Sequence, residues 1–156
     1  MARHREEVRR LAEPATEVVV AGGHVGELAR VLHLFHLAPA LPARVVAWSA
    51  GAMMLTERVV LFHDHVAHGV SATEVFGDGL GVVPRLVCLP HARRRLRTDD
   101  PVRMSVLARR FAPARCLVLD DGARVDLGPE GQVPADAKVV ADDGTITTVD
   151  PTAVPA

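Results

Sequence analysis

One serine stands where a buried strand is expected to turn sharply into a helix. Ser49 lies in AWSAGAMM, residues 47–54, between the apolar run ARVVAW and a helix-forming run. A small–x–Ser–x–Gly turn between a strand and a helix is the nucleophile elbow, in which a strained backbone lifts the serine hydroxyl clear of the sheet. The amide of the next residue, Ala50, then points at an oxyanion forming there. The alternative is a serine that only caps the following helix.

The elements that must position Ser49 alternate between strands and helices. Continuous apolar runs predict buried strands, and apolar residues at helical spacing predict helices. We expect strands at 16–23, 43–49, 58–62, 85–90 and 115–120, and helices at 6–13, 25–37, 50–57 and 99–112. The glycine-rich segment 63–84 is expected to be mostly loop, and the DG pairs at 121–122 and 143–144 are hairpin signals. This order is typical of a single α/β domain over residues 1–150, followed by a frayed tail at 151–156.

Composition fits one folded domain and gives no electrostatic case for nucleic acid. The 156 residues are 49% hydrophobic and 24% charged, with a formal net charge of −1. Cys88 and Cys116 each lie inside an apolar run, so we interpret them as small buried hydrophobes in a reducing compartment, with a disulfide as the alternative. No signal peptide and no apolar run long enough to span a bilayer are visible. We therefore expect a cytoplasmic protein without a membrane partner.

Three separate motifs resemble those of the peptidase E and cyanophycinase family of serine peptidases, in the class I glutamine amidotransferase-like superfamily. AWSAGAMM is similar to the family's G-W-S-A-G-A elbow. VVVAGGHVGEL, residues 18–28, resembles its Gly-Gly-Asn segment, and GDGLGVVPRLVCLPHARRRLR, residues 77–97, resembles its segment of Gly-Leu-Gly, strand and histidine. The resemblance covers residues 16 to about 128. It implies a flavodoxin-like, three-layer αβα fold with a mostly parallel sheet, to which the DG pairs add C-terminal β-hairpins.

The resemblance also implies a serine–histidine–acid triad that needs no cofactor. In the family the catalytic histidine comes at the end of a strand, and His91 comes at the end of LVCLP. The acid of peptidase E lies 15 residues after the serine, and the residue at that position here is Asp64. Ser49 would attack a carbonyl, and His91 would take the serine proton and return it to the leaving amine. Asp64 would hold the imidazole. His65 or a more distant acid is the alternative partner of His91.

Backbone amides complete the implied site. The amides of Gly22 or Gly23 and of Ala50 would form the oxyanion hole. Two residues depart from the family's pattern, since Ala47 replaces the first elbow glycine and His24 replaces the asparagine after Gly-Gly. The alanine adds a methyl group to a tightly packed turn, and the histidine alters the substrate-recognition wall. Both departures therefore bear on specificity.

Four arginines lie close after the predicted catalytic histidine, in HARRRLR at 91–97. Arg93 and Arg94 are candidates to bind substrate carboxylates, because a guanidinium matches a carboxylate in a bidentate manner. His24 and Trp48 are further candidates for the substrate-binding wall. This arrangement would suit a family that includes hydrolases of aspartyl dipeptides and of an aspartate–arginine polymer. The alternative is a solvated face whose arginines pair with acids such as Asp99 and Asp100.

A histidine cluster offers a rival chemistry. HDHVAH, residues 63–68, places three imidazoles and one carboxylate within six residues, and such groups can bind zinc. No cysteine–histidine spacing of a structural zinc site accompanies the cluster. We therefore predict solvated loop residues and no metal.

These features predict a serine-type, peptidase-like hydrolase that cleaves a small aspartyl-type peptide or amide through an acyl-enzyme on Ser49. The alternative is a catalytically silent amidotransferase-like domain that binds an acidic small ligand or a protein partner. Family members carry further strand–helix units before the Gly-Gly segment, so the resemblance implies an N-terminally shortened relative. The strand at 17–21 would then form an apolar sheet edge, at which the chain forms a homodimer or aggregates.

Overall fold

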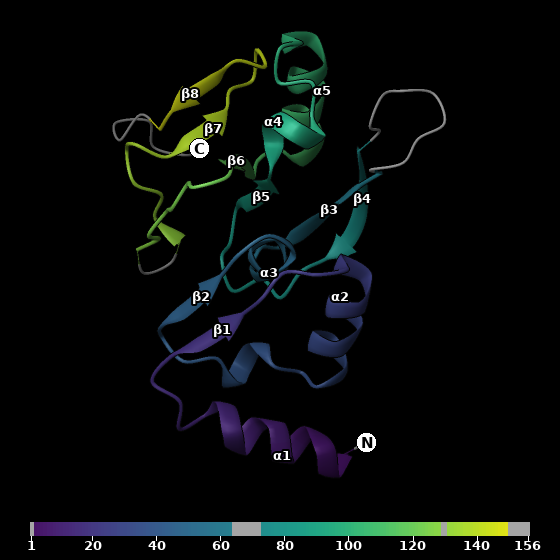
Figure 1. Ribbon diagram of the computed structural model, residues 1–156, viewed down its shortest axis with the longest axis vertical. Helices are drawn as coiled ribbons and strands as arrows, with labels where there is room; N and C mark the ends of the chain where they lie inside the picture. The colour runs from purple at the N-terminus through teal and green to yellow at the C-terminus, as the bar shows by residue number, and fades with distance from the viewer. Residues whose placement is uncertain (1, 64–72, 129–130, 150–156) are drawn as a thin grey trace.

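The computed structural model describes residues 2–63, 73–128 and 131–149. Helices and strands alternate along residues 2–62, and further on strands follow strands and α5 follows α4 (Figure 1). The elements in chain order are α1 (Ala2–Ala12), β1 (Val18–Val20), α2 (Val25–Leu34), the 3₁₀ helix η1 (Ala38–Ala40), β2 (Val45–Ala47), α3 (Ala50–Leu55), β3 (Arg58–Phe62), β4 (Thr73–Asp78), β5 (Leu86–Pro90), α4 (Ala92–Arg95), α5 (Pro101–Phe111), β6 (Arg115–Leu119), β7 (Lys138–Val140) and β8 (Ile146–Thr148). The predicted α/β class is confirmed.

The described strands pair in three groups. β1 and β2 are parallel, with Val18 opposite Val45. β3 and β4 are antiparallel, with an irregularity in register between Val59 and Val60. β5 and β6 are parallel, and β6, β7 and β8 follow as antiparallel neighbours, so the larger sheet has the order β5-β6-β7-β8. Parallel and antiparallel pairs therefore both occur among the described strands.

The two local expectations about the loops differ in outcome. In segment 63–84, expected to be mostly loop, residues Thr73–Asp78 form β4 along β3, and residues 64–72 lie outside the described ranges. The sequence does not reveal this strand, because its residues are all exposed or half-buried and therefore form no continuous apolar run. The DG pair at 121–122 makes a turn but closes no hairpin, since β7, the antiparallel partner of β6, begins only at Lys138. The DG pair at 143–144 does connect β7 to β8, and that hairpin is confirmed.

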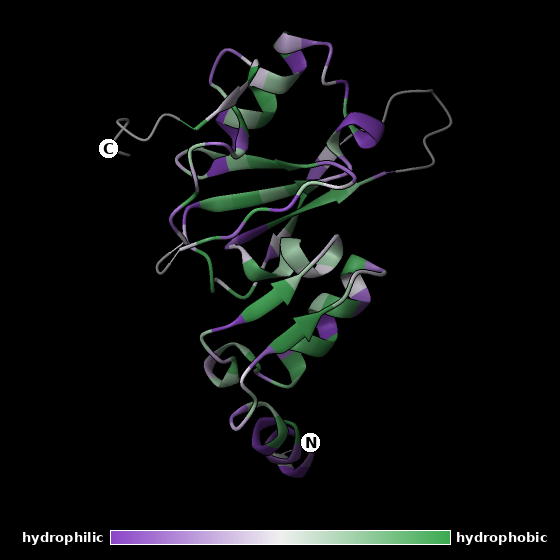
Figure 2. Ribbon diagram, turned by 60° about the vertical axis from the view of Figure 1, so that its left-hand side comes forward, coloured by the Kyte–Doolittle hydropathy of each residue, from purple (hydrophilic) through white to green (hydrophobic). Residues whose placement is uncertain are grey.

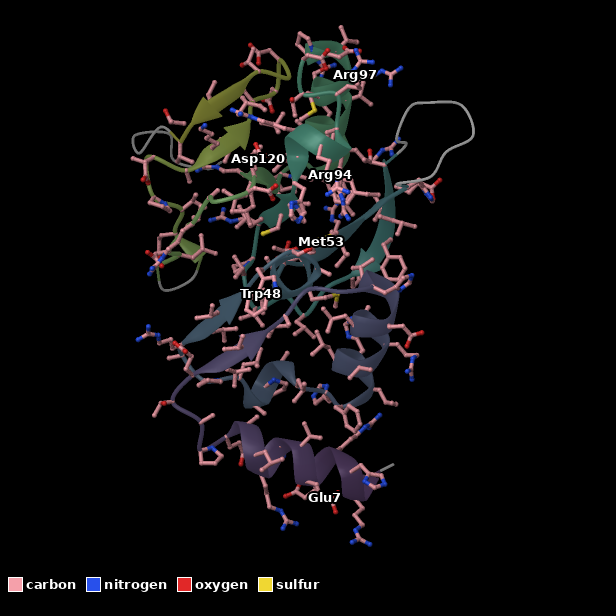
Figure 3. The ribbon with its side chains drawn as sticks, in the orientation of Figure 1. Glu7, Trp48, Met53, Arg94, Arg97 and Asp120 are labelled. Atoms are coloured by element: carbon pink, nitrogen blue, oxygen red, sulfur yellow. The ribbon has the colours of Figure 1, made fainter. Side chains whose placement is uncertain are left out.

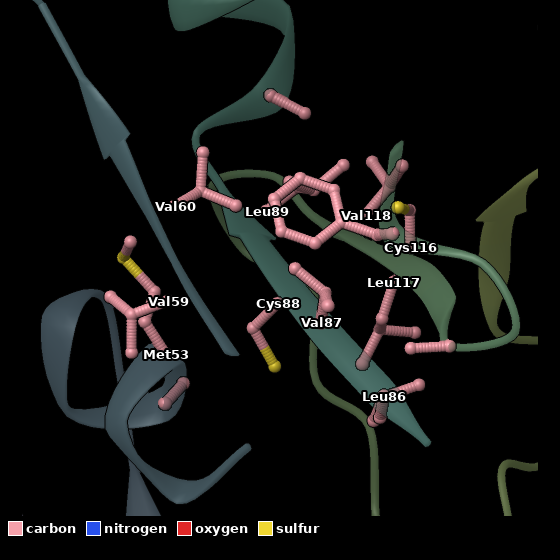
Figure 4. Close-up of a cluster of buried hydrophobic side chains, with 14 of the residues drawn as sticks. Met53, Val59, Val60, Leu86, Val87, Cys88, Leu89, Cys116, Leu117 and Val118 are labelled. Atoms are coloured by element: carbon pink, nitrogen blue, oxygen red, sulfur yellow. The ribbon is translucent and has the colours of Figure 1, made fainter. Parts of the chain in front are cut away.

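The hydrophobic core surrounds β5, all of whose residues are buried. Figure 4 shows β5 between β3 and β6, with the side chain of Met53 from α3 close by. Each fully buried Val, Leu or Met side chain stabilises the fold by about 1.5–3 kcal/mol relative to an exposed one. The end of β5, where His91 follows, is therefore held firmly in place.

The two cysteines lie in this core as free thiols. Cys88 is opposite Leu117 and Cys116 is opposite Val87, so the two thiols point to opposite faces of the sheet. Burial raises the pKa of each thiol to about 12. The expectation of two small, buried, unpaired cysteines is confirmed.

The β1–β2 pair carries exposed apolar side chains. Among the described residues β1 pairs only with β2, while the β7–β8 hairpin pairs with β6. Val19 of β1 is 54% exposed and Val46 of β2 is 42% exposed. Figure 2 shows both strands as hydrophobic ribbons and α1 as a mainly hydrophilic helix. The predicted apolar edge is therefore present in the described part of the chain, and association through it stays a prediction.

No helix among the described residues combines the length and the apolar character that crossing a membrane requires.

Candidate active site

Ser49 occupies a strained turn between β2 and α3. Its backbone has φ 52° and ψ −125°, a conformation that costs a residue other than glycine about 1–3 kcal/mol. The Ser49 side chain makes no capping hydrogen bond to α3. A serine that only caps a helix has an extended backbone and an occupied hydroxyl, so the capping alternative does not fit.

The glycines around the elbow allow the chain to pack closely on itself. A methyl group placed on Gly51 would lie 2.0 Å from the carbonyl oxygen of Val20. A methyl group placed on Gly22 would lie 2.9 Å from Cβ and 3.3 Å from Oγ of Ser49. The Gly-Gly segment after β1 therefore passes directly against the serine, because the amide of Trp48 donates to the oxygen of Val20 and joins the two strand ends.

Three backbone amides at the elbow have no hydrogen-bond acceptor among the described residues. The amides of Gly22, Gly23 and Ala50 donate no hydrogen bond to any described residue. Gly23 has φ 141°, a conformation that suits glycine, and Ala50 is buried at the start of α3. A backbone donor without an internal acceptor needs water or a ligand. These amides can therefore donate hydrogen bonds to an oxyanion beside the Ser49 hydroxyl.

His91 follows β5 and its ring is hydrogen-bonded to Asp121. The residue adopts a left-handed conformation, with φ 54° and ψ 41°, and its amide donates to the oxygen of Leu119 at 2.8 Å. Nδ1 of His91 lies 2.5 Å from Oδ1 of Asp121. A neutral imidazole that donates from Nδ1 keeps its lone pair on Nε2, which is the arrangement of a general base.

The register of two parallel strands explains this contact. Pro90 is opposite Leu119, so the residues that follow β5 and β6 emerge at the same sheet edge. Asp121 was not named from the sequence, although it fits the open alternative of a more distant acid. Its signal was the pair of carboxylates directly after RCLVL, the strand next to LVCLP. The acid implied by the resemblance, Asp64, and its alternative His65 lie outside the described residues.

The arginines after His91 differ in their partners. Nε of Arg93 lies 3.4 Å from Oδ2 of Asp120, and Arg97 pairs with Asp99. Arg94 forms no ion pair with a carboxylate of the described residues, and Figure 3 shows it over the region between α4 and α3. The paired-face alternative therefore holds for Arg97 and Arg93, and Arg94 is the guanidinium left available beside His91.

His24 and Trp48 lie in different settings. Nδ1 of His24 accepts the amide hydrogen of Glu27 at 3.3 Å, so its ring caps α2. This contact gives the histidine a structural use as the N-cap of α2. Trp48 is half exposed, and its ring lies 3.6 Å from a methyl group placed on Gly22. Trp48 therefore borders the elbow.

Only one residue of the histidine cluster HDHVAH, the alternative metal site, lies within the described residues. Residues 64–68 of HDHVAH lie outside the described ranges, and the remaining His63 has Nε2 3.5 Å from Oε2 of Glu74. Within residues 2–63, 73–128 and 131–149, no three His, Cys, Asp or Glu side chains are grouped to hold a metal ion.

The elbow carries a strained serine beside backbone amides without an acceptor among the described residues, and a histidine–carboxylate pair follows β5 and β6. α3, which begins directly after Ser49, lies against β5, which ends directly before His91. These are the groups that acyl transfer through a serine nucleophile requires. No protein-family model, curated protein or solved structure matches this chain.

Proposed function

We propose that this chain is a serine-type amide hydrolase, related to peptidase E and cyanophycinase, that cleaves a small aspartyl-type peptide or amide. The observation that carries the proposal is the backbone of Ser49, which is strained at a strand–helix turn and leaves the hydroxyl uncommitted. Strain of this kind persists where the surrounding structure enforces it, and it is concentrated at functional sites. Gly22 and Gly51 enforce it here, because neither position has room for a side chain.

The proposed reaction proceeds through an acyl-enzyme. Oγ of Ser49 attacks the amide carbonyl while Nε2 of His91 takes the serine proton, and Asp121 orients the imidazole in place of Asp64. The amides of Ala50 and the Gly-Gly segment stabilise the oxyanion, each by about 2.7–4 kcal/mol. His91 then gives its proton to the leaving amine as the C–N bond breaks. Water, deprotonated by His91, hydrolyses the ester and restores the Ser49 hydroxyl.

The guanidinium of Arg94 supports the proposal that the substrate carries a carboxylate. It lies three residues after His91 and has no carboxylate partner among the described residues, so its guanidinium is free to pair with a substrate carboxylate. Trp48, directly before Ser49, offers an exposed apolar face at the elbow. The preference for an aspartyl group comes from the family resemblance, and the arginine supplies the matching charge.

We further propose a flavodoxin-like arrangement for the whole domain. The support comes from the two parallel pairs, β1–β2 and β5–β6, whose carboxyl ends carry the Gly-Gly segment, Ser49, His91 and Asp121. In open parallel α/β sheets, sites form outside the carboxyl ends of the strands.

Peptide hydrolysis tests the proposed function. Purified protein is incubated with α-aspartyl and β-aspartyl dipeptides and with the matching asparaginyl dipeptides, and the free amino groups released are measured. We expect hydrolysis of an aspartyl peptide, its loss in Ser49→Ala, and a raised KM for aspartyl peptides in Arg94→Gln with little change for asparaginyl ones. Hydrolysis that survives in Ser49→Ala would contradict the proposal, and a folded protein that hydrolyses none of the peptides would favour the silent ligand-binding domain.

A further inference from the structure

A hollow lies between α4, β6 and the β7–β8 hairpin. Its volume is about 320 Å³ and it is lined by Arg93, Thr98, Val118, Asp120, Lys138, Ile146, Thr147 and Thr148. Figure 3 shows Asp120 between the hairpin and α4. A volume of this size matches the lower end of small-molecule sites, which hold ligands the size of a small metabolite. None of the lining residues belongs to the elbow or to the His91–Asp121 pair.

The strand register builds one wall of the hollow. Lys138 is opposite Thr148, and Val139 of the same strand is opposite Leu117 of β6. The next position of β6 along this register, Val118, therefore stands beside Lys138 on the same face. Val118 and Ile146 supply apolar surface, and Lys138 and Thr148 supply polar groups above it. The wall can thus hold a ligand that has both a hydrocarbon part and a charged end.

The polar groups of the hollow favour an anion. Lys138 is the only lysine of the chain, and it forms no ion pair with a carboxylate in the part of the chain that the structure describes. Asp120 is committed to Arg93, because its Oδ1 accepts the Arg93 amide hydrogen at 2.9 Å and its Oδ2 lies 3.4 Å from Nε. The guanidinium retains further N–H donors. Two cations face one carboxylate, and the threonine hydroxyls add neutral donors.

We propose that this hollow binds a small organic anion through a carboxylate or phosphate group. The oxyanion lies between Lys138 and the free N–H groups of Arg93, with hydroxyl donors from the threonines, and the apolar part rests on Val118 and Ile146. This site is independent of the proposed hydrolysis at Ser49, because it shares no residue with that reaction.

Ligand titration at constant ionic strength tests this site. Inorganic phosphate and succinate are the two probes, each titrated into full-length protein in a chloride buffer and followed by amide NMR shifts. We expect saturable binding of at least one probe, with the largest shifts at residues 138–148 and 118–120. The Kd should rise about three- to tenfold in Lys138→Gln, the loss of one charged contact at an accessible site. Binding of phosphate alone would assign a phosphate group, and binding of succinate alone a carboxylate.

Matched variants decide the outcome. Arg124→Gln removes an exposed arginine that pairs with Asp126 outside the hollow, and it should bind like the wild type. Thr148→Val keeps the shape of the wall, removes one hydroxyl and should also weaken binding. Ser49→Ala should bind the probes like the wild type whether or not Ser49 proves catalytic. The absence of saturable binding by both probes would overturn the proposal, as would equal affinities of the wild type, Lys138→Gln and Thr148→Val.

Discussion

The imidazole of His91 and the carboxylate of Asp121 meet at 2.5 Å, although 30 positions separate them in the sequence. The contact depends on neighbouring parallel strands, β5 and β6, that end together. His91 is 34% exposed and Asp121 82%, so the pair lies at the surface, where substrate can reach the histidine. The carboxylate's value therefore lies in orienting the ring, since an exposed ion pair adds little to stability.

Replacing Asp121 with Asn should slow the reaction of Ser49 about 10²-fold. The amide keeps the shape of the carboxylate and removes the charge that holds the imidazole, and in serine triads this change costs up to about 10⁴-fold in turnover. The smaller figure reflects the exposure of Asp121. Asp64→Asn is the control and should react nearly like the wild type. The rate of ester or peptide hydrolysis measures both variants, and the reverse order of effects would return the role to Asp64.

Strain at Ser49 should be visible in stability. Ser49→Gly relieves a positive φ that Ser49→Ala retains, and the strain of about 1–3 kcal/mol exceeds the entropy that glycine costs. We expect Ser49→Gly to be about 1 kcal/mol more stable than Ser49→Ala in urea unfolding. At Ser105, inside α5, the same comparison should have the opposite sign, because glycine is about 1 kcal/mol worse than alanine in a helix. A less stable Ser49→Gly would show that the turn is unstrained.

The buried thiols should make the fold less stable at high pH. Cys88 and Cys116 have a pKa of about 12 when folded, against 9.0 ordinarily. Above pH 9 the unfolded chain therefore loses thiol protons that the folded chain keeps, and the free energy of unfolding falls from there until about pH 12. Each thiol should cost about 1.4 kcal/mol at pH 10. Urea unfolding between pH 7 and 10 measures this loss, which Cys88→Ala should reduce; an unchanged slope in that variant would contradict the prediction.

The apolar edge at β1 should promote self-association. A strand edge without a partner is a template for pairing, and a lysine on the edge discourages it. We expect the wild type to associate at micromolar concentration in sedimentation velocity, and Val19→Lys to sediment as a monomer. Val102→Lys on α5 is the control, because Val102 is 73% exposed and lies on a helix. A wild type that remains a monomer would count against association through β1.

The sequence predicts the elbow well because the elbow is local. A strand, a serine between small residues and a helix stand next to one another in the chain, so their geometry is encoded within residues 43–57. Asp121 escaped prediction because its contact with His91 depends on which strands are neighbours, which no local pattern contains. The pairing of Arg93 with Asp120, the residue directly after β6, could not be predicted for the same reason. β4 was missed because an exposed edge strand has no hydrophobic period.

Labelling by a serine-directed fluorophosphonate tests the central claim most directly. The probe forms a covalent bond only with a serine hydroxyl that a neighbouring base activates, and peptide mass mapping identifies the residue. We predict that the wild type is labelled at Ser49, and that folded His91→Ala loses the labelling. A folded wild type that leaves Ser49 unlabelled, or equal labelling of the wild type and His91→Ala, would contradict the account.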